Sequence, residues 1–154
     1  MDLRQKLSAA LKDAMKSKDA ERLSTLRLIN AAIKDRDIAL RGTKAEEGAQ
    51  VGDDEVLAIL GRMVKQRQES ARAYEEGGRL ELAQKEQAEI GVIEDFLPRQ
   101  LDEAETEAAI DAAIADTGAT GIRDMGRVMG ELKARHMGQM DFGRVGPLVK
   151  ARLG

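Results

Sequence analysis

Apolar residues recur at helical spacing along almost the whole chain, and this pattern predicts helices from end to end. Residues 3–16 place an apolar side chain at every fourth position, and residues 19–40 repeat leucine and isoleucine at intervals of three or four. A third helix is expected to begin at Asp53, as its cap, and to end at Gly77 and Gly78. A fourth follows from Leu80 to about Leu97. The short link between these two predicts an antiparallel hairpin.

Two stretches interrupt the helical pattern. Residues 41–52 contain three glycines and no apolar repeat, so a mobile loop is expected there. Pro98 marks a boundary between two parts of the chain, because the residue before a proline avoids helical geometry.

Beyond Pro98 the pattern predicts three further helices. Asp102 and Glu105 form a capping-box pattern that opens the first, which is expected to stop at Gly118. The second is expected from about residues 120–122 to Gly138. The third is expected over residues 147–153 after a turn at 141–145, because Pro147 fits the first position of a helix and not its interior.

No strand pattern stands out, and the sequence therefore predicts an all-α protein. Residues 1–97 are expected to form an N-terminal helical domain of about four helices that includes a long helical hairpin. Residues 98–154 are expected to form a small C-terminal three-helix bundle.

Composition narrows the chemistry. The chain has no cysteine and one histidine, His136, so we expect no disulfide, no catalytic residue set, no metal site and no cofactor. No window approaches 18 apolar residues, which argues against a membrane span. The amphipathic amino terminus lacks the apolar run of a signal peptide, so a cytoplasmic location is expected.

Charge is distributed unevenly along the chain. Residues 1–42 carry ten Lys/Arg against six Asp/Glu, and residues 121–154 carry seven against three, whereas the middle is acidic. The basic ends could serve an anionic partner, or they could be attracted to the acidic middle.

Gly126 and Gly130 lie four residues apart inside a predicted helix, where each glycine costs roughly 1 kcal/mol relative to alanine. They therefore share one face, which permits close approach. Close packing of a neighbouring helix is the preferred interpretation, and exposure of backbone to a phosphate is the alternative. The basic residues of this region could neutralise nucleic-acid phosphates: Arg123, Arg127, Lys133, Arg135, Lys150 and Arg152.

Segments spread over the chain resemble the YqeY-like family. The opening segments are residues 11–16 (LKDAMK) and 23–27 (LSTLR), and residues 96–101 (FLPRQL) resemble the inter-domain junction of that family. Its C-terminal signature is matched by residues 124–129 (DMGRVM), Gly138, Asp141 and residues 149–153 (VKARL). The resemblance covers essentially the whole chain. It implies an all-helical fold whose C-terminal bundle is similar to the tail domain of the B subunit of tRNA-dependent amidotransferases.

This resemblance implies a function without implying a catalytic centre. The amidotransferase tail helps to position tRNA, while the chemistry lies in other domains and subunits. We therefore expect an accessory, tRNA-binding helical module, with tRNA or an amidotransferase-type protein as partner. Two alternatives stay open: a protein–protein adaptor that uses the hairpin of the third and fourth helices, and a non-catalytic subunit of a carbon–nitrogen ligase with glutamine as amido-N donor.

Overall fold

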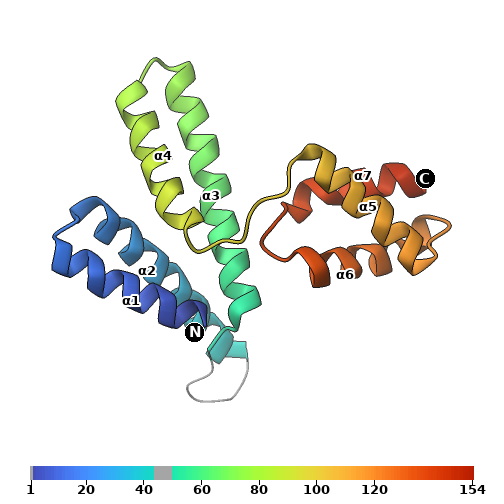
Figure 1. Ribbon diagram of the computed structural model, residues 1–154, viewed down its shortest axis with the longest axis horizontal. Coiled ribbons are helices and arrows are strands. Elements are labelled where there is room, and N and C mark those ends of the chain that lie inside the picture. The colour runs from blue at the N-terminus through green and yellow to red at the C-terminus, as the bar shows by residue number, and fades with distance from the viewer. Residues whose placement is uncertain (1, 44–49) are drawn as a thin grey trace. The chain divides into compact units, whose positions relative to one another are not determined.

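The computed structural model describes residues 2–43 and 50–154. In these residues the chain forms seven α-helices and one short 3-10 helix, without a strand, which confirms the predicted all-α class (Figure 1). The chain divides into two compact units, residues 1–97 and 98–154, and each unit has its own apolar core. Within the described ranges, every helix is too short or too polar to cross a lipid bilayer.

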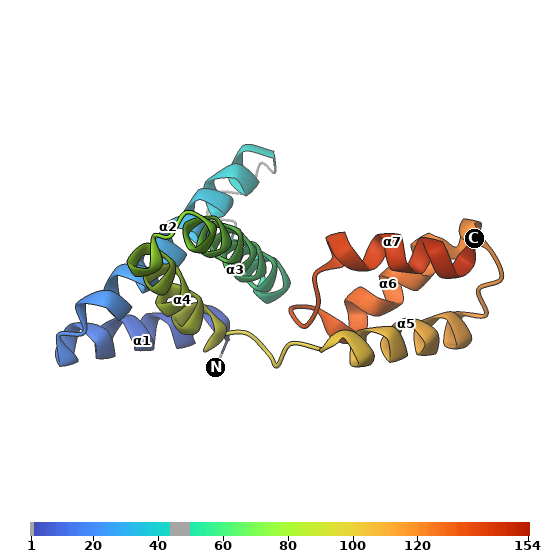
Figure 2. The same ribbon diagram turned by 90° about the horizontal axis from the view of Figure 1, so that it is seen from above.

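The N-terminal unit consists of two helical hairpins. The first pairs α1 (Leu3–Ser17) with α2 (Ala20–Thr43), and the second pairs α3 (Asp53–Glu76) with α4 (Leu80–Glu94) (Figures 1 and 2). The first hairpin contributes to a shared core with the start of α3 and the end of α4. The largest fully buried side chains of this core are Leu7, Leu26, Ile29, Val56, Leu60 and Ile93.

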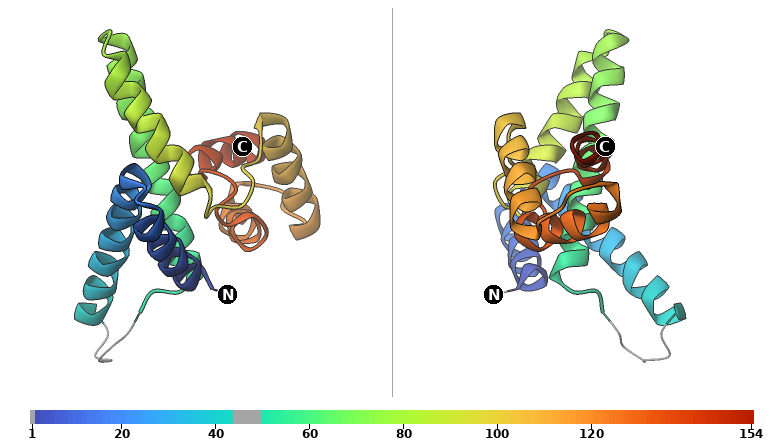
Figure 3. Two further views of the ribbon diagram at one scale, coloured as in Figure 1. Left: turned by 60° about the vertical axis from the view of Figure 1, so that its left-hand side comes forward. Right: turned by 90° about the vertical axis from the view of Figure 1, so that its right-hand side faces the viewer.

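The remainder of the α3–α4 hairpin extends beyond this shared core. The two helices stay side by side in every view (Figure 3), and small buried residues, Ala71 and Ala83, line their contact. Arg67 of α3 donates to the carboxylate of Glu89 of α4 at 3.2 Å, and both side chains are largely buried. The hairpin is thus held by close helix approach and one largely desolvated ion pair.

Two helix boundaries in this unit differ from the sequence prediction. Asp53 does not cap α3: Gly52 is the N-cap residue, and Asp53 instead accepts a hydrogen bond from the Leu3 N–H at 3.4 Å. The α4 helix ends at Glu94 and not near Leu97. The N–H groups of residues 96 and 97 bond to carbonyls three positions back, so a tight turn leads to the proline.

Part of the segment expected as a loop, 41–52, is helical. Residues 41–43 continue α2, and Leu40 packs against the core, which stabilises the end of the helix despite Gly42. Residues 44–49 of the predicted loop lie outside the described residues. Val51 is buried and anchored, since its N–H donates to Asp37 at 2.8 Å and its carbonyl accepts from Arg4.

The C-terminal unit contains α5 (Glu103–Thr117), the 3-10 helix η1 (Ile122–Asp124), α6 (Met125–His136) and α7 (Phe142–Leu153). α6 packs against both other helices. Its buried face carries Val128 and Leu132, with Met125 and Met129 packed beside them. The other buried members of this core are Ile110, Ala113, Val145 and Val149.

The predicted start and stop of α5 are confirmed. Asp102 accepts from the Glu105 N–H at 2.7 Å, and Glu105 accepts from the Asp102 N–H at 3.2 Å, which completes the capping box. Gly118 adopts a left-handed conformation, φ 67°, at the C-cap. Arg99 also binds Glu105 through both carboxylate oxygens, at 2.9 and 2.7 Å.

The predicted turn at 141–145 is wrong, because α7 begins at Phe142 and holds Pro147 in its interior. Asp141 caps this helix by accepting from the Gly143 N–H at 2.9 Å. Proline in this position removes one helical hydrogen bond and crowds the carbonyl of Gly143. The helix tolerates this proline for two reasons. Gly143 is exposed in the first turn, where its carbonyl can tilt toward water. Val145 and Val149 are buried in the core, and their burial stabilises the helix on both sides of Pro147.

Acidification should destabilise the C-terminal unit through Glu105. The Arg99 guanidinium, and then the Asp102 N–H, lower the pKa of Glu105 from its ordinary value of 4.5 to about 2. Because the pKa in the folded state is the lower one, this stabilisation is complete above about pH 4.5 and is lost as the pH falls toward 2. Thermal melts at stepped pH should show a steeper loss in the wild type than in Glu105→Gln. Parallel curves for the two proteins would contradict the assignment.

Candidate nucleic-acid interface

The exposed face of α6 is built from small residues. Gly126, Gly130 and Ala134 follow one another at intervals of four, so they lie in a row, and all three are exposed. A side chain at either position would have free space around its Cβ atom. Apart from the backbone of α6 itself and the two neighbouring residues in the chain, no atom of the described residues lies within 4 Å of that position. The preferred interpretation of close helix packing is therefore wrong. Val128 and Leu132 turn the opposite face of α6 toward the core.

Basic side chains flank this row. Lys133 follows Gly130 by three residues and Gly126 by seven, which places it on the same face, and Arg127 lies at the edge. Arg123 precedes them in η1, and all three residues are exposed. The Lys133 ammonium lies 5.9 Å from the centre of the Phe142 ring of α7, a cation–π contact that orients it.

Three of the six predicted RNA-binding residues are joined to carboxylates. Arg127 contacts Asp124 at 2.6 Å, and Arg135 contacts both Asp116 and Glu131 at 2.8 Å. Arg152 pairs with Asp111. Two of these pairs link α5 to another helix, so they serve cohesion of the unit and reduce the charge offered to a phosphate. We call Arg127, Arg135 and Arg152 the paired set.

The other three predicted residues, Arg123, Lys133 and Lys150, form no ion pair within the part of the chain that the structure describes. We call them the unpaired set. Arg144, exposed in the first turn of α7, joins them in having no such pair. Sequence reasoning missed Arg144, because the presence of Pro147 argued for a turn at this position.

Local placement matters because the unit as a whole is not basic. Residues 98–154 contain eight Lys/Arg and nine Asp/Glu. Hydrogen bonding by the Thr120 N–H, and then by the Arg127 guanidinium, lowers the pKa of Asp124, so this carboxylate stays charged beside the α6 face. An anionic partner would therefore be attracted by the unpaired set and not by net charge.

These features define a class: a small all-helical protein of two units, the second of which exposes a glycine-lined, cation-flanked helix. The family described as "Yqey-like protein" matches residues 4–153. The chain therefore belongs to the YqeY-like family, in agreement with the resemblance seen in its sequence motifs.

Curated relatives share the name "Altered inheritance of mitochondria protein 41, mitochondrial". The protein of Meyerozyma guilliermondii is 41% identical over 91 residues, which cover 59% of this chain and 44% of that protein. The protein of Lachancea thermotolerans is 31% identical over 110 residues, covering 71% and 54% respectively. A Saccharomyces cerevisiae relative is 30% identical over 91 residues, covering 59% and 46%. The chain thus spans about half the length of the curated relatives it matches.

The names of these relatives bear on the expected location. All three are called mitochondrial, which contradicts the cytoplasmic location expected from the amino-terminal sequence. The amphipathic character of residues 2–6 belongs to α1 and its cap, where Asp2 accepts from the Gln5 N–H at 2.8 Å. The pattern of this segment is explained by helix formation and carries no information on the cellular location of the protein.

Proposed function

We propose that this YqeY-like protein is an accessory module that binds tRNA through the exposed face of α6. The unpaired set, Arg123, Lys133 and Lys150, would neutralise phosphates, and the paired set would keep the three helices together. The protein would hold tRNA for an enzyme partner of the amidotransferase type and would have no catalytic centre of its own. The likeness of the C-terminal segment to the amidotransferase tail is what points to tRNA.

One observation carries the proposal: Gly126 and Gly130 weaken α6 and contribute no packing within the described chain. Glycine in a helix interior costs roughly 1 kcal/mol relative to alanine. A surface without Cβ atoms lets a sugar–phosphate backbone approach the helix closely, and neighbouring cations then contact the phosphates. With 2% aromatic residues, recognition would use shape and phosphates more than base stacking.

The adaptor alternative has less support from the structure. It requires an apolar surface on α3 and α4, but the large apolar residues of this hairpin, Leu80 apart, are buried or half-buried, most of them in the core of the N-terminal unit. Leu80, 61% exposed, is the single exposed large aliphatic side chain of α3 and α4 in the described residues. This hairpin therefore offers little apolar area to a partner protein.

Replacing both glycines by glutamine tests the proposal. The double variant Gly126→Gln, Gly130→Gln should stabilise α6 by roughly 0.5 kcal/mol per site, because glutamine is the better helix former and nothing obstructs its side chain. It should weaken tRNA binding by about tenfold, or about 1.4 kcal/mol, because two side chains now cover the approach. Fluorescence anisotropy with labelled tRNA at low salt measures the binding.

The chain supplies a matched control. Gly61 of α3 and Gly91 of α4 are also exposed, and a Cβ there would also meet nothing within 4 Å. Gly61→Gln, Gly91→Gln should therefore give a similar gain in stability with unchanged tRNA affinity. Equal affinity of both double variants would remove the α6 face from the proposal, and a wild-type protein that binds no tRNA at low salt would remove the function.

A further inference from the structure

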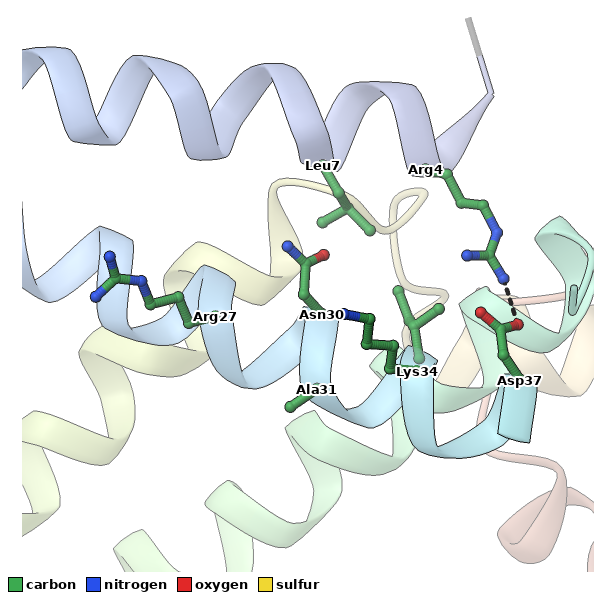
Figure 4. A pocket seen from close by; sticks show the side chains of 8 residues that line it. Arg4, Leu7, Arg27, Asn30, Ala31, Lys34 and Asp37 are labelled. Carbon is green, nitrogen blue, oxygen red and sulfur yellow. Dashed lines mark hydrogen bonds and ion pairs between the residues drawn. The ribbon is translucent and has the colours of Figure 1, made fainter. Parts of the chain in front are cut away.

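A groove between α1 and α2 of the N-terminal unit combines an apolar floor with a basic rim. Its volume is about 440 Å³, within the range of small-molecule sites (Figure 4). The floor includes Leu7 of α1 and Ile33 of α2, which are both buried. Among the described residues, Arg4, Arg27 and Lys34 supply cations to the lining, and Asp37 supplies a carboxylate.

The Asp37 carboxylate already has hydrogen-bond donors within the protein. Asp37 accepts from Arg4 at 2.6 Å and from the Val51 N–H at 2.8 Å, and it is 5% exposed. Burial alone would raise the pKa of Asp37, but these hydrogen bonds outweigh it, and the pKa lies below its ordinary value. Asp37 therefore neutralises Arg4 and ties α2 to the chain before α3, and it adds little repulsion for an incoming anion.

The other two cations remain available. Arg27 and Lys34 are exposed and form no ion pair within residues 2–43 and 50–154, which the structure describes. They lie on the same side of α2, seven residues apart. Between them Asn30 points toward Leu7, and the Lys34 side chain runs back toward Asn30 (Figure 4). The Lys34 amine and the Asn30 amide thus meet over the apolar floor, whereas the Arg27 guanidinium points away from them along α2 (Figure 4).

This combination suits a ligand with an anionic end and a flat, weakly polar body. A single phosphate would use the cations but leave the floor uncovered. We propose that the α1–α2 groove binds a nucleotide, with its base over Leu7 beside the Asn30 amide and its phosphate on Lys34, and that the exposed Arg27 side chain turns toward this phosphate when the nucleotide binds. The nucleotide is either a free nucleoside monophosphate or the phosphorylated end of an RNA strand. The site lies in the N-terminal unit and does not require the α6 face.

Titration of the ¹⁵N-labelled full chain with AMP, followed by amide chemical shifts, tests the site. We expect saturable shifts in the segments around residues 4–7 and 27–37. Adenosine and inorganic phosphate should each bind at least about tenfold more weakly than AMP, since each satisfies half of the groove. Arg27→Gln, Lys34→Gln should weaken AMP binding by about tenfold or more. Its spectrum should remain that of the folded protein, because both side chains are exposed.

The control removes the same charge elsewhere on this hairpin. Lys12→Gln, Lys16→Gln on α1 lies outside the groove and should leave AMP affinity unchanged. Equal weakening by both double variants, or shifts spread over the protein, would overturn the site. A short RNA with a 5′-phosphate that binds the groove when AMP does not would assign it to strand ends. If neither AMP nor the 5′-phosphorylated RNA binds the groove, the proposed nucleotide site is wrong, whatever the outcome of the tRNA test on α6.

Discussion

Replacing Leu132 by alanine is expected to unfold the C-terminal unit while the N-terminal unit stays folded. Leu132 is fully buried between α6 and its neighbours. Truncating a buried leucine costs about 2–5 kcal/mol, because the cavity left behind closes only partly. Domains shorter than about 70 residues rarely gain more than about 3–5 kcal/mol from their core, so this single change removes most of the stability of the unit of residues 98–154.

Amide spectra of the full chain distinguish the two units in this experiment. In Leu132→Ala, resonances of residues 98–154 should collapse to the narrow range of an unfolded chain, while those of residues 2–43 should keep their positions. The matched variant is Leu60→Ala, in the N-terminal core, where the leucine is equally buried. It should lower the stability of the N-terminal unit alone. Loss of both units in either variant would show that they unfold as one.

Neutralising the unpaired set is expected to weaken tRNA binding far more than neutralising the paired set. The triple variant of Arg123, Lys133 and Lys150 to glutamine removes three cations that have no internal ion pair in the described chain. It should reduce the slope of log affinity against log salt by roughly 2 to 3, close to one unit per phosphate contact. Between about 50 and 200 mM salt, the wild type should lose affinity much more steeply than this variant.

The triple variant of Arg127, Arg135 and Arg152 carries the same change in charge. Because these residues bind Asp124, Asp116, Glu131 and Asp111, their loss should lower the melting temperature and affect tRNA binding less. Fluorescence anisotropy should therefore show the larger loss of tRNA affinity in the variant of the unpaired set. Thermal melts should show the larger loss of stability in the variant of the paired set. If both triple variants lose affinity equally, net charge alone governs the interaction and the α6 face carries no special role.

Local sequence signals were reliable where a short stretch of chain contains the whole interaction. The capping box of Asp102 and Glu105 and the left-handed stop at Gly118 each involve residues that are neighbours in sequence, and both are confirmed. The predictions based on Asp53 and Pro147 were wrong, because these two helix boundaries do not depend on neighbouring residues alone. Whether a helix begins one residue earlier or extends through a proline depends on what the flanking residues bury, and that is settled by distant partners.

The candidate site divides in the same way. Residue type and spacing were enough to find the glycine row and the six cations. The ion pairs are different, since the contact of Arg135 with Asp116 requires α5 to lie against α6. The groove residues Arg27, Asn30 and Lys34 were not recognised as a site, because they become one only when α1 lies opposite them. Their seven-residue span on one face of α2 was the available signal.

By itself, the sequence of this protein determined that it is helical, approximately where its helices lie, and which residues share a helix face. Helical periodicity carries this information because residues three and four apart meet within a single helix. The tertiary structure alone decided that the Gly126 and Gly130 face of α6 is not covered by another helix of this unit. Val128 and Leu132 face the core contributed by α5 and α7, which leaves Gly126 and Gly130 exposed. It also decided which cations are neutralised, because an ion pair between helices depends on how those helices pack.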